Sequence, residues 1–212
     1  MTFKLKEGNK DRWEILIDGK KWREVHRAIF GKKPVFPPLY SENDYQAIFD
    51  DFEFRRVKGY VLWRLSTQSY HSEQLVKLLR ERLVQNKTID RVLQEYKKMG
   101  FLDDESWLQS FILNQQRRYS LRFILSKLNA KGLSSDTLQR LATEWKKPEE
   151  ELQAIQHLLQ TRYRSKDLSN YQTKQKVIAA LMRKGFEFDQ VQTAIQSYTH
   201  DSGNNKFNEG IT

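Results

Sequence analysis

Apolar and polar residues alternate near the start of the chain, which is the pattern of a strand with one buried face. Trp13, Ile15 and Ile17 fall on one side of this strand, and the dipeptide Asp18-Gly19 follows directly. Asp-Gly is typical of a type I′ turn, because both central residues of that turn need a positive φ. The pattern therefore predicts a β-hairpin centred on Asp18-Gly19.

Two flanking segments are expected to complete this hairpin region. An earlier strand is expected at Phe3 and Leu5, and residues 25–30 fit a short helix that ends at Gly31. Proline at positions 34, 37 and 38 prevents the helix from continuing. We expect the next helix to be capped by Ser41 or Asn43 and to pass through residues 45–52.

From about residue 44 the apolar residues recur at helical spacing, and superposing the helical segments indicates a repeat. Shifts of 49 and then 53 residues align equivalent apolar and aromatic positions: Leu75, Leu79 and Tyr96; Ile124, Leu128 and Trp145; Val177, Leu181 and Tyr198. The second shift also aligns Gly132 with Gly185. Chance register among amphipathic helices is the alternative explanation.

Each repeat is expected to be a three-helix module, opened by a helix at residues 57–66, 104–116 or 149–164. The expected parts are an N-terminal region (1–52), three modules (53–101, 102–147 and 148–199) and a disordered polar tail (200–212). We predict a mainly α fold in which the modules stack into an elongated, curved body behind a small N-terminal β-hairpin and helix region. Leu79, Leu128 and Leu181 should each be core residues.

Composition narrows the classes of protein. The chain has 212 residues and no cysteine, which excludes disulfides and cysteine nucleophiles. It lacks an apolar run long enough to span a membrane and an apolar segment typical of a secretory signal near its start, so we expect a soluble cytoplasmic protein.

The net charge is +10, and it is unevenly distributed. Residues 106–147 carry 8 basic and 2 acidic side chains, whereas residues 148–212 carry 8 of each. Such a cluster favours a phosphate backbone or an acidic protein surface as partner. A solvated helix face is the alternative interpretation.

The basic residues recur on the equivalent helix of each module, which would line one face of a stack. In the middle module the candidate contacts are Arg117, Arg118, Arg122, Lys127 and Lys131. The candidates in the outer modules are Arg80, Arg82, Lys174, Lys176, Arg183 and Lys184. Tyr70, Tyr119 and Tyr171 precede these helices and could stack on bases, although packing at the helix entry is the preferred interpretation.

The sequence offers little support for catalysis. The four histidines are scattered, there is no glycine-rich phosphate loop, and we expect neither a metal site nor a cofactor. Asp103, Asp104 and Glu105 are better explained as a helix cap than as metal ligands, because consecutive helical residues point in different directions. Glu53, close to Asp50 and Asp51, is expected on a solvated helix face. We therefore expect no enzyme.

Two segments resemble the RecX family. The first combines a Gly-aromatic-Leu-Asp-Asp turn with a helix and a basic pair: Gly100-Phe101-Leu102-Asp103-Asp104, then Trp107, Ser110, Phe111 and Arg117-Arg118. The second, residues 174–195, is similar to the last module of the family and contains Leu181-Met182-Arg183-Lys184-Gly185-Phe186 and Phe188-Asp189. Trp107 departs from the family pattern, where Phe or Tyr is commoner.

This resemblance implies a regulator of the recombinase RecA. Proteins of this family lodge in the groove of the RecA filament on DNA, modulate its ATPase, strand-exchange and coprotease activities, and can bind DNA directly. We expect RecA and its DNA filament as partners, a monomer, and no membrane contact. A general DNA- or RNA-binding module is the alternative function, and a nuclease is the third.

Overall fold

A computed structural model describes residues 2–35 and 45–208, with side chains described up to residue 200. The chain divides into two compact units, Met1–Trp107 and Leu108–Thr212, and each is described by itself. The expected cap at Ser41 or Asn43 lies outside the described residues.

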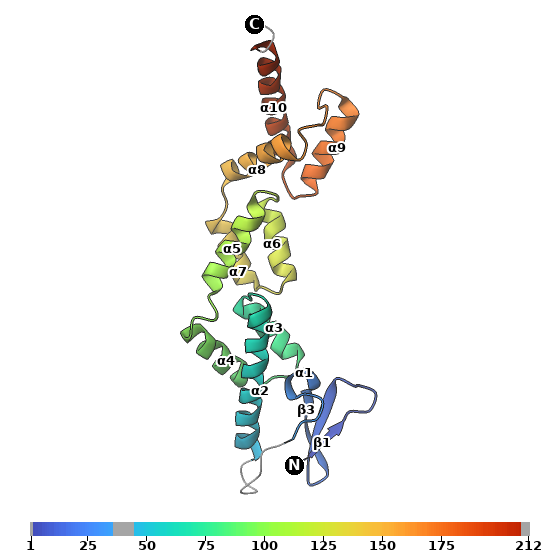
Figure 1. Ribbon diagram of the computed structural model, residues 1–212, viewed down its shortest axis with the longest axis vertical. Helices are drawn as coiled ribbons and strands as arrows, with labels where there is room; N and C mark the ends of the chain where they lie inside the picture. The colour runs from blue at the N-terminus through green and yellow to red at the C-terminus, as the bar shows by residue number, and fades with distance from the viewer. Residues whose placement is uncertain (1, 36–44, 209–212) are drawn as a thin grey trace. The chain divides into compact units, whose positions relative to one another are not determined.

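Unit 1 begins with a three-stranded antiparallel sheet in the order β1-β2-β3 (Figure 1). The strands are β1 (Thr2–Leu5), β2 (Arg12–Ile17) and β3 (Lys20–His26). Asp18 and Gly19 have φ values of 50° and 76°, as the predicted type I′ turn requires. The predicted hairpin and the earlier strand are both confirmed.

The short helix α1 (Arg27–Phe30) begins later than the sequence predicted. Val25 belongs to β3, where it pairs with Trp13 of β2. The helix starts only after His26, whose ring Nδ1 accepts a hydrogen bond of 3.0 Å from the amide of Ala28. Gly31 ends the helix as expected, with a φ of 86°.

Three helices follow in unit 1: α2 (Tyr45–Thr67), α3 (Ser72–Glu81) and α4 (Asn86–Lys98). Helix α2 is continuous and crosses the boundary that the sequence suggested between residues 52 and 53. Its buried side chains, Phe49, Glu53, Val57 and Val61, are four residues apart. They form one uninterrupted buried stripe, so packing gives the helix no reason to break.

Glu53 corrects an expectation, because it is only 1% exposed rather than solvated. Its carboxylate accepts hydrogen bonds from the hydroxyl of Thr88 (2.5 Å) and the side-chain amide of Gln85 (3.0 Å). Both partners come from the start of α4. A buried carboxylate is tolerated only when it is hydrogen-bonded in this way.

Unit 2 contains two sets of three helices, with α5 beginning just before the unit boundary. The helices are α5 (Asp104–Gln116), α6 (Leu121–Ala130), α7 (Ser135–Glu144), α8 (Pro148–Thr161), α9 (Tyr171–Met182) and α10 (Phe188–Asn208). Leu79 of α3, Leu128 of α6 and Leu181 of α9 are all fully buried, so the predicted core positions are confirmed.

The predicted division into modules and a disordered tail stays a prediction. Helix α10 extends to Asn208. The described side chains end at residue 200, and residues 209–212 are outside the described part of the chain. Within the described residues, no helix combines the length and the apolar character needed to cross a bilayer.

Candidate functional site

A close backbone approach joins the two helix sets of unit 2. The amide of Ser120, which caps α6, donates a 3.1 Å hydrogen bond to the carbonyl of Lys184 in the turn after α9. Gly185 follows with a φ of +93°, and a Cβ at this position would come within 2.3 Å of the Ser120 hydroxyl oxygen. Only glycine fits such an approach. The contact brings Lys184 to the segment between α5 and α6.

Tyr119 lies at the centre of this junction. Its ring stacks on Phe123, with ring centroids 4.7 Å apart and planes 10° apart. The ammonium nitrogens of Lys127 and Lys184 lie 3.7 Å and 4.6 Å from the centroid of the Tyr119 ring. Lys127 also donates a 3.0 Å hydrogen bond to the side-chain oxygen of Gln115. Both ammonium groups are therefore within the range of cation–π attraction to the Tyr119 ring.

A cleft of about 870 Å³ opens beside Tyr119, and we call it the basic cleft. Its lining residues come from the end of α5, the α5–α6 turn, α8 and the α9–α10 turn: Leu113, Asn114, Gln116, Arg117, Arg118, Tyr119, His157, Leu158, Thr161, Arg162 and Lys184. Four of these side chains are cationic at neutral pH and none is a carboxylate. The basic cleft is therefore suited to an anionic partner.

The structure brings together only some of the predicted contact residues. Arg117, Arg118 and Lys184 line the basic cleft, and Lys127 lies beside it against Tyr119. The remaining candidates of unit 2 are not among its lining residues: Arg122, Lys131, Lys174, Lys176 and Arg183. Arg80 and Arg82 belong to unit 1, where Arg82 lines a separate pocket and Arg80 donates to the Asn86 side chain.

Sequence reasoning missed Arg162 and His157 as members of this site. His157 lies on α8 and Arg162 caps its C-terminal end, in the segment that was expected only to open the third module. A partial signal was available, because His157 and Thr161 are four residues apart and therefore share one side of a helix. It was overlooked because the segment was interpreted from its apolar residues alone.

The three tyrosines before the basic helices have different surroundings. Tyr70 is buried and Tyr119 is half-buried, whereas Tyr171 is 74% exposed. Arg64 lies 5.1 Å from the Tyr70 ring, so this tyrosine also packs against a cation. The packing interpretation therefore suits Tyr70 and does not extend to Tyr171.

The acidic cluster at the start of α5 has the structural role expected of it. Asp103 accepts hydrogen bonds from the amide (3.0 Å) and the hydroxyl (2.7 Å) of Ser106, which is a helix-capping arrangement. Asp104 turns the other way, pairing with Lys97 at 2.7 Å and accepting from the amide of Ser72 at 2.6 Å. Over residues 2–35 and 45–200, no group of three or more potential ligands could hold a metal ion.

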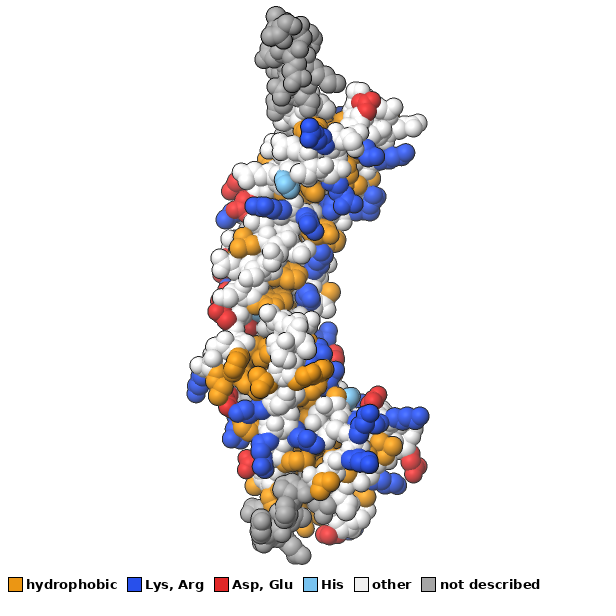
Figure 2. Space-filling view, in the orientation of Figure 1, with side chains coloured by type: hydrophobic (Ala, Val, Ile, Leu, Met, Phe, Trp, Pro, Cys, Tyr) orange, Lys and Arg blue, Asp and Glu red, His pale blue; other side chains and the backbone are white. Residues whose placement is uncertain are grey.

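The surface of unit 2 shows the same excess of positive charge as the basic cleft. On the face shown in Figure 2, lysine and arginine side chains are more widespread than acidic ones over the helices of unit 2. Arg117 and Arg118 follow the last turn of α5, where cations also interact favourably with the helix dipole. Stabilising that helix end and binding an anion are compatible roles for the same side chains.

Comparison with known proteins identifies relatives of the chain. A family model described as the third three-helix domain of RecX matches residues 149–195. The regulatory protein RecX of Streptococcus sanguinis is 27% identical over 158 residues, which cover 74% of this chain and 60% of that protein. RecX of Clostridium perfringens is 25% identical over 77% of this chain and 78% of the relative.

The chain spans only about 57–60% of the length of the first curated relatives that it matches. Two solved structures share its fold. A crystal structure of regulatory protein RecX has a TM-score of 0.55 at 20% identity and covers 92% of this chain and 97% of its own. RecX from Lactobacillus salivarius has a TM-score of 0.53 at 17% identity, with 68% and 95% covered. The match to the third domain, the curated relatives and the shared fold agree, and together they support an assignment to the RecX family of regulatory proteins.

Proposed function

We propose that the chain regulates RecA in the cytoplasm, by binding the RecA filament and modulating its ATPase, strand-exchange and coprotease activities. Similarity to regulatory RecX proteins supports a regulatory role, and RecA is the partner that the family resemblance implies. The proposed contact is the basic cleft of unit 2, which would meet acidic RecA surfaces or DNA phosphates.

One observation carries this assignment of the contact. Four cations from three separate parts of unit 2 line one cleft that has no carboxylate of its own: Arg117 and Arg118, Arg162, and Lys184. Arginine is suited to both targets, because its planar guanidinium can make paired hydrogen bonds to a carboxylate or a phosphate. Phosphate contacts of this kind give affinity without reading base sequence.

The test is the ATPase activity of RecA on single-stranded DNA with the purified chain added. The wild-type chain should change the rate, and the triple variant Arg117→Glu, Arg118→Glu, Arg162→Glu should have lost that effect. The matched control, Arg140→Glu, Lys146→Glu, Lys166→Glu, changes the net charge equally at exposed positions outside the cleft. It should retain the effect.

The possible results separate the alternatives. If the cleft variant and the control act on RecA equally well, the basic cleft is not the contact. If the wild-type chain binds nucleic acid but leaves RecA unaffected, the chain is a general nucleic-acid-binding module instead.

A further inference from the structure

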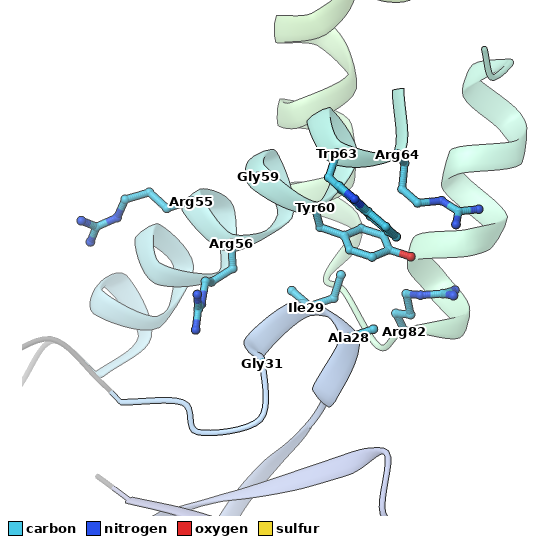
Figure 3. A pocket seen from close by; sticks show the side chains of 10 residues that line it. All are labelled: Ala28, Ile29, Gly31, Arg55, Arg56, Gly59, Tyr60, Trp63, Arg64 and Arg82. Atoms are coloured by element: carbon cyan, nitrogen blue, oxygen red, sulfur yellow. The ribbon is translucent and has the colours of Figure 1, made fainter. Parts of the chain in front are cut away.

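Unit 1 contains a second cationic pocket, which has no role in the proposed function above. It has a volume of about 710 Å³ and lies between α1, α2 and the turn after α3. The lining side chains are arginines and aromatic or apolar residues: Ala28, Ile29, Gly31, Arg55, Arg56, Gly59, Tyr60, Trp63, Arg64 and Arg82. None of them is a carboxylate. We call this the arginine–tryptophan pocket (Figure 3).

The aromatic part of the pocket is open to a ligand. Trp63 is 57% exposed, and its ring centroid lies 5.9 Å from that of Tyr60. Gly59 is one turn earlier on the same helix, and a Cβ placed there would meet nothing within 4 Å. Gly59 is exposed, so the missing side chain leaves room for a flat group to lie on Trp63.

The cationic part is held in place without being neutralised. Arg56 donates a 2.6 Å hydrogen bond to the carbonyl of Phe30, and Arg82 donates one of 3.0 Å to the carbonyl of Leu78. Carbonyl acceptors orient a guanidinium but leave its charge uncompensated. Within the described part of the chain, no carboxylate forms an ion pair with any of the four arginines of the pocket: Arg55, Arg56, Arg64 and Arg82.

The two parts face the same space. In Figure 3 the rings of Tyr60 and Trp63 lie between Arg56 on one side and Arg64 and Arg82 on the other, and Arg55 points away. The Arg82 guanidinium lies 5.5 Å from the Tyr60 ring, and that of Arg64 lies 5.7 Å from the Trp63 ring. A planar ring and an anionic group joined by a short linker would therefore meet both parts at once.

We propose that the arginine–tryptophan pocket binds a nucleoside phosphate, with its base on Trp63 and its phosphate beside Arg64 and Arg82. Bases stack on aromatic side chains irrespective of their identity, and guanidinium groups bind phosphate through paired hydrogen bonds. A sugar phosphate has no planar aromatic ring to stack on Trp63. An acidic peptide has anionic groups but no linked base. Neither ligand would therefore use the whole pocket. The nucleotide could be free or an exposed residue of a single strand. This inference does not depend on the basic cleft.

The indole N–H resonances of the 15N-labelled protein provide the direct test. The chain has five tryptophans, and the variant Trp63→Phe assigns the resonance of Trp63. Adenosine monophosphate should shift the Trp63 resonance, whereas adenosine and ribose 5-phosphate should each bind about tenfold more weakly or worse. A short oligodeoxynucleotide identifies the source: a shift with the strand alone assigns a strand-borne nucleotide, and a shift with both shows that the free nucleotide is sufficient.

Gly59→Leu tests the position of the ligand without removing any packed group. The new side chain should occupy the pocket, preserve helicity and weaken binding about tenfold or more. Arg64→Gln with Arg82→Gln should weaken binding similarly, and the control Lys98→Gln, at an exposed position outside the pocket, should not.

Three results would overturn the proposal. The first is an unmoved Trp63 resonance with both nucleotide sources at about 10 mM, a concentration well above a millimolar Kd. The second is unchanged affinity in Gly59→Leu. The third is equal binding of ribose 5-phosphate or of a short polyglutamate peptide, which would show a general anion site.

Discussion

Gly185 lies against Ser120 so closely that a single added carbon would come within 2.3 Å of the Ser120 hydroxyl oxygen. The same turn carries Lys184, whose carbonyl accepts the Ser120 amide and whose ammonium group lies 4.6 Å from the Tyr119 ring. The geometry of the basic cleft therefore depends on a residue that has no side chain.

Replacing Gly185 with alanine should destabilise unit 2 by about 2 kcal/mol or more. The alanine would have to keep a positive φ, and its Cβ would clash with the Ser120 hydroxyl oxygen. Urea unfolding followed by circular dichroism measures the change. Gly100→Ala is the matched control: its φ is +76°, but nothing lies within 4 Å of the added carbon. It should cost only about 1 kcal/mol. Equal losses in the two variants would show that the close approach to Ser120 contributes nothing.

Truncation of the repeated core leucines should be costly at each position. Leu79, Leu128 and Leu181 are fully buried, so each change to alanine should lower the free energy of unfolding by about 2–5 kcal/mol. Leu113→Ala provides the comparison, since Leu113 is 46% exposed and should lose about 1 kcal/mol or less. A loss at Leu128 as small as that at Leu113 would contradict its place in the core.

The cleft also predicts which single charge reversals matter most. Arg162→Glu should weaken the effect on RecA as strongly as Arg117→Glu, because both side chains line the same cleft. Arg122→Glu should have the smaller effect, although Arg122 is closer in sequence to Arg117. Dose–response curves of RecA ATPase activity measure all three. If Arg122→Glu proves the most damaging, the contact follows the exposed face of α6 instead.

Stability should fall in mildly acidic solution because of His71. This histidine caps α3 by accepting a 3.2 Å hydrogen bond from the amide of Glu73 through Nδ1, and burial lowers its pKa despite the nearby Asp104 carboxylate. The folded protein thus binds a proton less readily than the unfolded chain, so the free energy of unfolding decreases as pH falls below about 6.5. Losing the cap should cost about 1 kcal/mol.

His71→Asn tests this directly, because asparagine can cap the helix but does not titrate in this range. The pH dependence of its urea midpoint between neutral and mildly acidic pH should be flatter than that of the wild type. Some dependence should remain, since burial also lowers the pKa of His26, which caps α1. A variant as pH-sensitive as the wild type would show that His71 does not control the acid response.

Patterns among neighbouring residues were sufficient to predict much of the fold. The Asp18-Gly19 turn depends on the backbone preferences of two adjacent residues, and α5 was predicted with its observed ends because Asp103 and Asp104 mark its start. The core positions were predictable for the same reason, since helical periodicity identifies the buried face of each helix. Val25 was assigned to the wrong element, because its membership in β3 depends on pairing with Trp13.

What the sequence by itself determined was the mainly helical fold, the hairpin, the core leucines and the excess of positive charge, all properties of neighbouring residues or of composition. Only the tertiary structure decided that Glu53 is buried beneath Thr88, that Arg162 shares a cleft with Arg117, and that Gly59 opens a space beside Trp63. These arrangements depend on which helix faces pack together. Packing brings together residues that are distant in the sequence. Helical periodicity identifies the buried face of each helix, but it does not indicate which other helix that face contacts.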